Sequence, residues 1–282
     1  MELNANNQKF VNESLKKGFR VDGRGIYDLR NLKIDLGNQY GSVEVQLGET
    51  RVHAKTSIEL ARPLPDRPSE GIFIISVDFS GPGSLQQGEK VSGPASGVAA
   101  GSDAEGRAAA QEVAISRLLE KILKSTRVVD VESLCISVGE QVWRLRVDVH
   151  FLDYGGNYLD AGIIAAVSSL SHFRRPEVLK VGETTTIYSV EERAPVPLSI
   201  NNIPACLTFA YFENELLVLD PSYLEEKFMS GSISIAINSN SELCCISKAG
   251  GIAIEPDTVN LCIVVAIEKA KFLIDAIRSA LK

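Results

Sequence analysis

The residues with the clearest chemical potential form a glycine turn, Gly155-Gly156, between a strand-like run and an almost wholly apolar helix. Backbone N–H groups at such a turn, together with the positive end of the helix dipole, can bind a phosphate group. A bound phosphate also needs a cation that neutralises its charge, and no Lys or Arg occurs between Asp153 and Asp160. The turn therefore predicts the backbone geometry of an anion-binding site, but the segment contains no cation that could neutralise the anion.

Other side chains that could do chemistry show no catalytic grouping. The three histidines, His53, His150 and His172, lie in separate predicted elements and are interpreted as structural. The acidic pairs Glu191-Glu192 and Glu225-Glu226 could bind a metal or transfer a proton, but adjacent carboxylates point in different directions and are usually solvated. The sequence identifies no base for any serine, and the Walker and Rossmann patterns are absent. We therefore expect no metal site and no cofactor.

A basic stripe follows one predicted helix, where Arg117, Lys121 and Lys124 recur at helical spacing. One interpretation is an ordinary solvated face, partly neutralised by Glu112 and Glu120. The other is contact with the backbone of a nucleic-acid strand, because Arg presents a planar fork to a phosphate. Few aromatic residues interleave the stripe, so base stacking would add little. The residues alone leave both interpretations open.

Composition limits the class of protein. The chain has 282 residues, 45% of them hydrophobic and 23% charged, which is typical of globular proteins with one large or two modest cores. Its net charge of −7 argues against a generally basic nucleic-acid coat. No apolar run reaches eighteen residues and residues 1–17 are polar, so we expect neither a membrane span nor secretion. The five cysteines, without CxxC spacing, predict reduced core thiols in an intracellular protein.

The elements that must position these residues fall into two halves. In the first half, β-type runs separated by glycine turn signals predict a meander, and changes to helical periodicity predict helices. Residues 81–106 are rich in Gly, Ser and Ala and predict a mobile loop. We expect a polar helix at 6–17 with Phe10, Val11 and Leu15 on one side, strands at 29–36, 41–47, 51–60 and 72–77 (the last one buried), a helix at 107–124, a hairpin at 134–152, and a buried helix at 161–172 capped by Asp160.

The second half repeats this layout after a linker punctuated by Pro176, Pro195 and Pro197. Because strands and helices recur twice in similar order, the sequence predicts a duplicated, layered α+β architecture. We expect strands near 205–212, 216–219, 232–237 and 242–247, a short helix near 221–229, and a long amphipathic helix from Asp257.

A set of short motifs runs along nearly the whole chain outside residues 81–106. They are Arg20-Val-Asp-Gly-Arg24, Leu47-Gly-Glu-Thr50, Glu132-Ser-Leu-Cys135, Gly155-Gly-Asn157, Leu159-Asp160-Ala161, His172-Phe-Arg-Arg-Pro176, Glu191-Glu-Arg193, Pro195-Val-Pro-Leu-Ser-Ile200, Leu219-Asp-Pro221, Glu225-Glu226 and Gly250-Gly251. Together these motifs resemble the RNase PH domain, the fold of phosphorolytic 3′→5′ exoribonucleases and of the six-membered ring of the RNA exosome. The combination is highly specific.

The resemblance implies a fold and a division of the chain. The fold is α+β, an RNase PH fold of the ribosomal protein S5 domain 2-like type with two layered β/α halves. The implied parts are an N-terminal helix and arm at residues 1–28, an RNase PH core at 29–175 that contains the mobile loop 81–106, and a C-terminal RNase PH subdomain at 190–282.

By the same resemblance, two catalytic groups of active family members are replaced. Active members place Gly-Thr-Arg at a helix N-terminus, where the Arg holds the attacking phosphate, and the corresponding positions are Asn157 and Tyr158. Loss of this Arg removes both positioning and charge stabilisation of the phosphate. Active members also use an Asp as general acid, and the matching position holds Ser232, whose hydroxyl is no acid near neutral pH. The resemblance thus implies a subunit without catalytic residues.

What the resemblance leaves is assembly and RNA handling. It implies partnership with other RNase PH-type exosome subunits in a hexameric ring, with S1/KH-type cap subunits and with single-stranded RNA, in the nucleus, nucleolus and cytoplasm. Arg117 and Arg107 match positions where such subunits keep arginines that face RNA. Two alternatives stay open: an active phosphorolytic exoribonuclease with another phosphate ligand such as Arg193, and a structural scaffold without RNA contact.

Overall fold

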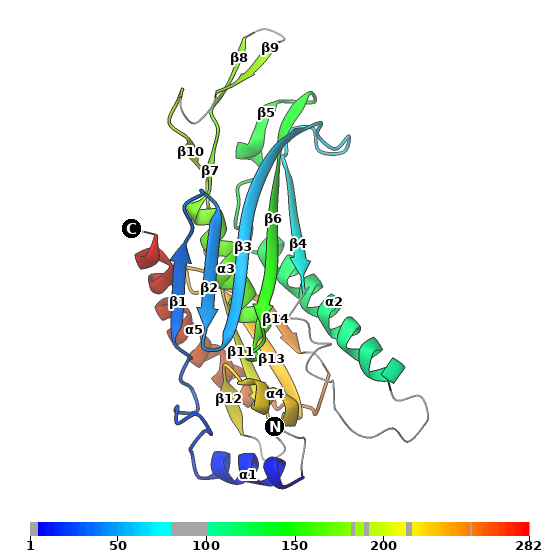
Figure 1. The fold of residues 1–282 in the computed structure, drawn as a ribbon, viewed down its shortest axis with the longest axis vertical. Coiled ribbons are helices and arrows are strands. Elements are labelled where there is room, and N and C mark those ends of the chain that lie inside the picture. Colours follow the sequence, from blue (N-terminus) through cyan, green and yellow to red (C-terminus); the bar gives the residue numbers. More distant parts are fainter. Residues whose placement is uncertain are drawn as a thin grey trace.

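The computed structural model describes residues 5–79, 101–181, 184–188, 192–212, 216–248 and 250–281 (Figure 1). No helix in these ranges combines the length and apolar composition needed to cross a membrane. The elements are α1 (Ala5–Lys16), β1 (Leu32–Leu36), β2 (Ser42–Leu47), β3 (Thr50–Ala61), β4 (Ile72–Asp78), α2 (Gly101–Ser125), the 3-10 turn η3 (Glu132–Leu134), β5 (Cys135–Ser137), β6 (Gln141–Asp153), α3 (Tyr158–His172), β7 (Arg174–Arg175), β8 (Val178–Val181), β9 (Thr184–Ile187), β10 (Val196–Pro197), β11 (Ala205–Tyr211), β12 (Leu217–Leu219), α4 (Tyr223–Phe228), β13 (Gly231–Ile237), β14 (Leu243–Lys248) and α5 (Pro256–Ala280).

The first sheet is built from the predicted meander. β1, β2 and β3 pair antiparallel in sequence order, and β3 pairs with β6 along its length, beginning with Arg51 opposite Asp153. Side chains of successive strand residues point to opposite faces. Val43, Val45 and Leu47 of β2 accordingly lie in the core, and the residues between them are more exposed.

β4 differs from the prediction of a buried strand. The strand order is β1-β2-β3-β6-β4, so β4 lies at the sheet edge, where it pairs parallel with β6. Each of its residues is half-buried or exposed. Continuous apolar runs are typical of strands covered on both faces, so composition could not reveal the edge position.

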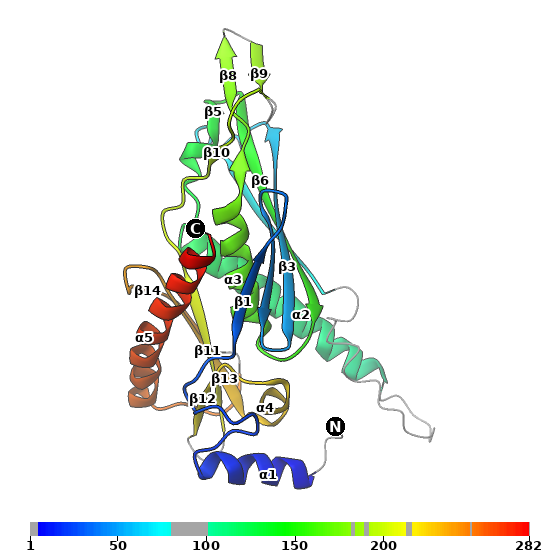
Figure 2. The same ribbon diagram turned by 60° about the vertical axis from the view of Figure 1, so that its left-hand side comes forward.

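Helix α3 lies between the two sheets and forms the centre of the core (Figure 2). It packs against β2, β3 and β6 of the first sheet and against β11 of the second. The second sheet has the order β12-β11-β13-β14, all antiparallel, and α5 packs against β11 and β13. Every residue of α3 from Tyr158 to Leu170 is buried, because both of its faces are covered.

Helix α1 packs onto the second half of the chain. Val11 and Leu15 are buried with Ala210 and Phe212 in a small cluster apart from the main core. Phe10 was expected on the same side, but its side chain is 60% exposed. Val11 and Leu15 are four residues apart and define one helix face, whereas Phe10 lies one residue off that face.

Helix α2 begins earlier than predicted. Residues 101–106, assigned to the mobile loop, form its first turns, while residues 81–100 of that loop lie outside the described residues. The two glycines at 101 and 106 each disfavour a helix by about 1 kcal/mol. The stretch was therefore a weak helix former and not a loop.

The proline-punctuated linker carries strands of its own that the sequence did not predict. β7 pairs with β10, and β8 forms an antiparallel hairpin with β9. This hairpin extends away from the two sheets at the top of Figure 1. The linker is thus a structured arm between the two halves.

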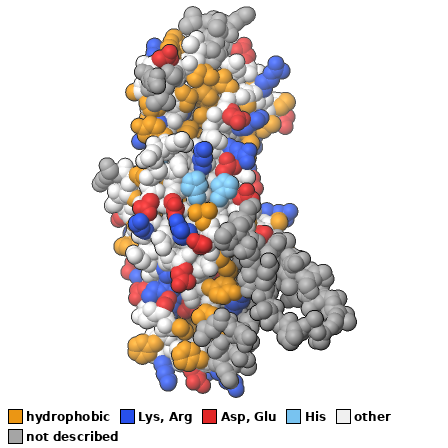
Figure 3. All heavy atoms as spheres, in the orientation of Figure 1, with side chains coloured by type: hydrophobic (Ala, Val, Ile, Leu, Met, Phe, Trp, Pro, Cys, Tyr) orange, Lys and Arg blue, Asp and Glu red, His pale blue; other side chains and the backbone are white. Residues whose placement is uncertain are grey.

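Two histidines that the sequence placed in separate strands are cross-strand neighbours. His53 of β3 lies opposite His150 of β6, with ring centroids 6.3 Å apart. Figure 3 shows two histidine side chains side by side on the exposed face of the molecule. Burial lowers the pKa of His53, and the proximity of His150 lowers it further.

The cysteines agree only in part with the prediction of core thiols. All five are free. Cys206, Cys245 and Cys262 are buried, whereas Cys135 and Cys244 are only half-buried. The last two lie in β5 and β14, at positions that the sheets leave partly open.

Candidate functional site

The turn at Gly155-Gly156 is held closely between two other segments. A Cβ atom on Gly155 would lie 2.6 Å from Cβ of Glu49, and one on Gly156 would lie 2.6 Å from the backbone nitrogen of Tyr223. Gly156 also has a φ of 94°, which side chains disfavour. The carbonyl of Gly155 accepts a hydrogen bond from the Tyr223 N–H at 3.0 Å. Close backbone approach therefore requires both glycines and fixes the turn against the start of α4.

A carboxylate of the protein already occupies the backbone N–H group at this turn. Asn157 is the N-cap of α3, and its N–H donates to Oε1 of Glu226 at 2.8 Å. Oε2 of Glu226 accepts a hydrogen bond from the Tyr154 hydroxyl at 2.5 Å. Burial raises the pKa of Glu226, although both hydrogen bonds oppose this. The helix terminus that could bind an external anion thus holds an internal one.

Tyr158, the first residue of α3, lies in an aromatic cluster. Its ring stacks on Tyr154 with centroids 4.4 Å apart and lies 4.6 Å from the ring of Phe151 and 5.5 Å from that of Phe79. Burial raises the pKa of the Tyr158 phenol, and the Glu226 carboxylate raises it further. This residue is therefore a neutral member of the core and offers no charge to a phosphate.

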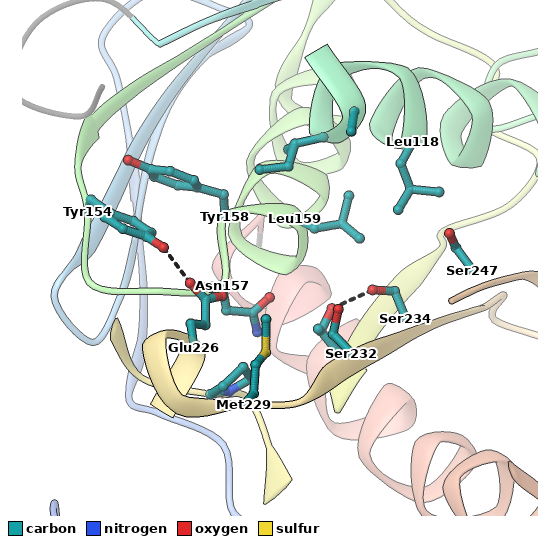
Figure 4. Close-up of a pocket in the computed structure, with 14 residues that line it drawn as sticks. Leu118, Tyr154, Asn157, Tyr158, Leu159, Glu226, Met229, Ser232, Ser234 and Ser247 are labelled. Carbon is teal, nitrogen blue, oxygen red and sulfur yellow. Dashed lines mark hydrogen bonds between the residues drawn. The ribbon is translucent and has the colours of Figure 1, made fainter. Parts of the chain in front are cut away.

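A cavity of about 220 Å³ opens beside this helix terminus, between α2, α3, β13 and β14 (Figure 4). Tyr158 and Ser232 both line it, so the structure brings together the two positions that sequence comparison had marked as replaced. No described residue that lines the cavity is a Lys, an Arg or a His. The lining residues are Ala114, Ile115, Leu118, Tyr154, Asn157, Tyr158, Leu159, Thr208, Pro221, Glu226, Met229, Ser232, Ser234 and Ser247.

Asp160 is buried and does not cap the helix as predicted, because α3 begins at Tyr158, three residues before the predicted start, and its N-cap is Asn157. Its carboxylate accepts hydrogen bonds from Asn157 Nδ2 at 2.7 Å and from the Thr208 N–H and hydroxyl at 2.9 and 2.8 Å. The Thr208 hydroxyl lies 3.1 Å from that of Ser234, which lines the cavity. Burial and the neighbouring Asp220 raise the pKa of Asp160 to about 7, against these hydrogen bonds.

Arg30 is the arginine that contacts the glycine turn, and its guanidinium is already bound by other groups of the protein. Arg30 binds both oxygens of buried Asp220, at 2.8 and 3.0 Å, and also donates to the carbonyls of Gly155 and Gly156 at 2.9 and 3.0 Å. Burial alone would raise the pKa of Asp220. The hydrogen bonds from Arg30 and Asn157 outweigh burial and hold this pKa below its usual value. Arg30 therefore fastens the glycine turn to the second half and is satisfied by the protein itself.

The arm that precedes β1 contributes a second buried ion pair. The side chain of Arg20 is fully buried and lies 2.5 Å from Oε2 of Glu225. It also donates to the carbonyls of Leu219 and Asp220 at 2.7 and 2.9 Å. The prediction that Glu225-Glu226 is solvated was therefore wrong: both carboxylates are held by residues far away in sequence.

The predicted RNA-contacting residues lie outside the cavity. Arg117 is exposed on α2 and makes no hydrogen bond or ion pair with the rest of the described chain. Lys124, further along the stripe, pairs with Glu120 at 2.6 Å. The backbone of Arg107 lies in α2, and its side chain is outside the described residues. The predicted helix for the stripe is thus confirmed, and contact with RNA stays a prediction.

The alternative phosphate ligand is not placed near the turn. Arg193 pairs with Glu177 at 2.9 Å, and its guanidinium lies 4.0 Å from the ring centroid of Tyr188 in the linker arm. It does not line the cavity. Within the described ranges, no group of three His, Cys, Asp or Glu side chains could hold a metal ion.

Comparison with known proteins adds family information to this geometry. The profile of the 3′ exoribonuclease family, domain 1, matches residues 28–176, and that of domain 2 matches residues 202–269. The chain is 42% identical to exosome complex component rrp45 of Schizosaccharomyces pombe over 282 residues, which is all of this chain and 91% of that protein. It is 38% identical to exosome complex component RRP45 of Homo sapiens over 276 residues, and it spans 59% of that longer protein.

Solved structures share the arrangement of elements. A chain of the Archaeoglobus fulgidus exosome with RNA bound to its active site superposes with a TM-score of 0.76 at 23% identity, covering 96% of this chain and 97% of that one. Rice Rrp46 superposes with a TM-score of 0.62 at 14% identity, covering 93% and 100%. At these identities the likeness concerns the fold alone.

Proposed function

The chain belongs to the 3′ exoribonuclease family, with both RNase PH domains, and on that premise we propose that it is a ring subunit of the RNA exosome that does not itself catalyse. Its relatives along the full length are exosome complex components named rrp45 and RRP45. This is the polymyositis/scleroderma autoantigen subunit, to which the strings around Pro176 and Pro195 are also similar. In this role the chain supports 3′→5′ RNA processing and degradation through assembly and RNA threading.

The observation that carries the lack of catalysis is the uncharged Tyr158 at the start of α3, at the position matched to the Arg with which active family members hold the attacking phosphate. At the same helix terminus, the carboxylate of Glu226 accepts the Asn157 N–H. A phosphate there would meet a negative charge and no described cation along the cavity wall. Phosphorolysis depends on a positioned and neutralised phosphate, so this geometry disfavours the reaction.

Ser232 supports the same conclusion independently. It lines the cavity on β13 at the position matched to the general acid, and a serine hydroxyl cannot supply a proton near neutral pH. The nearby carboxylate with a raised pKa, Asp160, is buried and bound by three hydrogen bonds. We therefore assign it to positioning Asn157 and Thr208, not to proton transfer.

The partners that follow are other RNase PH-type subunits in a hexameric ring, S1/KH-type cap subunits and single-stranded RNA, with action in the nucleus, the nucleolus and the cytoplasm. Arg117 is our candidate for RNA contact, because it is exposed and has no partner in the described chain. Arg107 is the second candidate, since it lies two to three turns earlier on the same helix.

Two alternatives are tested with this proposal. An active exoribonuclease would need a phosphate ligand, and Arg193 is engaged with Glu177 in the linker arm. A scaffold without RNA contact would leave Arg117 as part of a solvated helix face. We expect the purified chain to release no nucleoside diphosphate from labelled RNA, with or without inorganic phosphate. Phosphate-dependent release that is lost on Arg193 substitution would establish the enzyme instead.

A further inference from the structure

We propose that helix α1 and the turn after it form a second binding surface for single-stranded RNA, on which phenylalanine rings stack on bases and lysines contact phosphates. The surface consists of Lys9, Phe10, Lys16, Lys17 and Phe19, and we call it the α1 surface. The inference rests on the proposed function for the source of this ligand. The α1 surface belongs to a different helix from the basic stripe on α2.

Two aromatic rings of the α1 surface face solvent. The side chain of Phe10 is 60% exposed and that of Phe19 is 69% exposed. Val11 and Leu15 hold the other side of the helix against the second half of the chain, so the two rings stay at the surface. Figure 3 shows hydrophobic and basic side chains at the lower end of the molecule, where α1 lies in Figure 1.

The end of the helix brings the two rings to the same side. Gly18 has a φ of 80°, and its N–H donates to the Leu15 carbonyl at 2.9 Å. The Phe19 N–H donates to the Ser14 carbonyl at 3.1 Å. These two bonds define a Schellman motif, in which the chain folds back along the helix. Because Ser14 lies one turn after Phe10, Phe19 is folded back beside the face that carries Phe10.

The charge of the α1 surface suits a polyanion. Residues 8–19 contain three lysines, Lys9, Lys16 and Lys17, and one acid, Glu13. Three positive charges less one negative charge give +2, whereas the net charge of the whole chain is −7. All three lysines are exposed, and within the described part of the chain their side chains make no hydrogen bond or ion pair. Lys17 follows Phe10 by seven residues and therefore shares its face of the helix.

This combination favours RNA over other partners. Proteins that bind single strands combine a positively charged surface with aromatic rings on which bases stack. Lysine is depleted in protein interfaces, so three lysines beside the rings disfavour a protein partner. A helix that binds a membrane inserts its apolar face, but Val11 and Leu15, the apolar face of α1, are buried in the protein. Few aromatic residues interleave the stripe on α2, so α1 supplies the stacking that the stripe lacks.

The first test is photochemical crosslinking of the assembled complex. The chain is co-expressed with other RNase PH-type exosome subunits, and the complex is irradiated with single-stranded RNA that carries 5-iodouridine, which crosslinks to a stacked aromatic ring. Trypsin cuts after Lys and Arg, so the two rings fall on separate fragments, residues 10–16 and 18–20. We expect an RNA adduct on one or both fragments. Adducts confined to other fragments, or none at all, overturn the proposal.

The second test separates stacking from charge. Phe10→Ala combined with Phe19→Ala should raise the Kd for RNA about tenfold, because base stacking is lost. Lys16→Gln combined with Lys17→Gln should reduce the slope of log affinity against log salt by about 1.4, since each lost phosphate contact to a single strand removes about 0.7. Fluorescence anisotropy of the complex at several salt concentrations measures both. Unchanged affinity in the phenylalanine variant, or an unchanged slope in the lysine variant, contradicts the proposal.

Matched controls come from exposed residues elsewhere in the chain. Leu64→Ala removes an apolar side chain that is 56% exposed, and Lys33→Gln removes an exposed lysine that pairs with Asp35. We expect both controls to bind RNA like wild type, and an equal loss in them contradicts the assignment to α1. Arg117→Glu is measured on the same complex. RNA binding that responds to Arg117→Glu but not to the variants of the α1 surface removes this inference alone and leaves the proposed function intact.

Discussion

At the scale of single residues, the polar and charged groups around the start of α3 bind one another inside the protein. Glu226 accepts the Asn157 N–H, and Arg30 is bound to Asp220 and to the carbonyls of the glycine turn. Tyr158 lies in an aromatic cluster. Several of these residues would have to change together to create a phosphate site. A single substitution would leave the remaining interactions intact.

The first prediction concerns restored catalytic groups. Tyr158→Arg alone should not create phosphate-dependent release of nucleoside diphosphates, because Glu226 still occupies the helix terminus and Ser232 still cannot act as an acid. Burying a cation in the aromatic cluster should also destabilise the fold. The measurement is product release from labelled RNA at saturating phosphate, with Tyr158→Phe as the matched control for packing. Phosphorolysis by Tyr158→Arg would show that one cation is enough.

The second prediction concerns pH and Asp160. Its folded-state pKa of about 7 lies above the model-peptide value of 3.8, so the folded state prefers the protonated form. Its contribution to the free energy of unfolding is fully present below pH 3.8 and is lost as pH rises to 7. The total loss is on the order of 4 kcal/mol. The free energy of unfolding of wild type, relative to that of Asp160→Asn, should therefore fall as pH rises. Urea denaturation of both proteins between pH 4.5 and 8 measures this difference.

A difference that does not change with pH would mean that Asp160 stays ionised in the folded protein. Other carboxyl groups titrate in both proteins, so they cancel in the comparison. The three hydrogen bonds to Asp160 would then dominate over its burial.

Sequence identified the residues of this site unequally. The glycine turn and the positions of Tyr158 and Ser232 were recognised from local strings and family resemblance. The role of Glu226 was not, because its partner Asn157 is 69 positions away and adjacent carboxylates usually face solvent. The pairing of Arg20 with Glu225 spans 205 positions. Only folding brings such pairs together, so no local pattern signals them.

At the scale of elements, strands and helices with a clear period were predicted well. The meander, the hairpin of β5 and β6 and the amphipathic helix α5 appear where their patterns placed them. The misses are an edge strand, β4, an early helix start in α2 and a linker arm with four short strands. The edge strand and the linker strands depend on tertiary pairing, and the start of α2 consists of weak helix formers. The periodicity of hydrophobic residues along the sequence carries no signal of either.

The third prediction belongs to helix α2. Arg117→Glu in the assembled complex should weaken RNA binding and reduce the slope of log affinity against log salt by about one unit, because one phosphate contact is lost. Arg107→Glu should act in the same direction more weakly. Fluorescence anisotropy at several salt concentrations measures both. Lys124→Glu is the control, since Lys124 is already paired with Glu120 near the end of the helix. Unchanged affinity and slope for Arg117→Glu would identify the stripe as a solvated face.

The fourth prediction belongs to the N-terminal arm. Arg20→Met leaves Glu225 buried without its cation and should lower the free energy of unfolding by about 3–5 kcal/mol. Lys33→Met is the control, because its pair with Asp35 is more than half exposed on both sides, and surface pairs contribute about 0–1 kcal/mol. Urea denaturation of the two variants measures the difference. Equal stability would mean that the arm is not fastened through Arg20.

At the scale of the whole molecule, the duplicated α+β architecture and the RNase PH fold expected from the sequence are confirmed. The division into 1–28, 29–175 and 190–282 stays a prediction, since Arg20 and Arg30 connect the arm and the first half with the second half. β1, β4, β12 and β14 lie at sheet edges, and Leu261, Val264 and Phe272 of α5 are exposed. Such surfaces favour association, so we expect poor solubility of the chain alone and improvement with an RNase PH-type partner.

The most direct test of the proposed role is native mass spectrometry of the chain co-expressed with other RNase PH-type exosome subunits. We predict one stable complex with six RNase PH-type subunits, in which this chain is a stoichiometric member. A well-behaved monomer without affinity for any such partner would contradict the ring role.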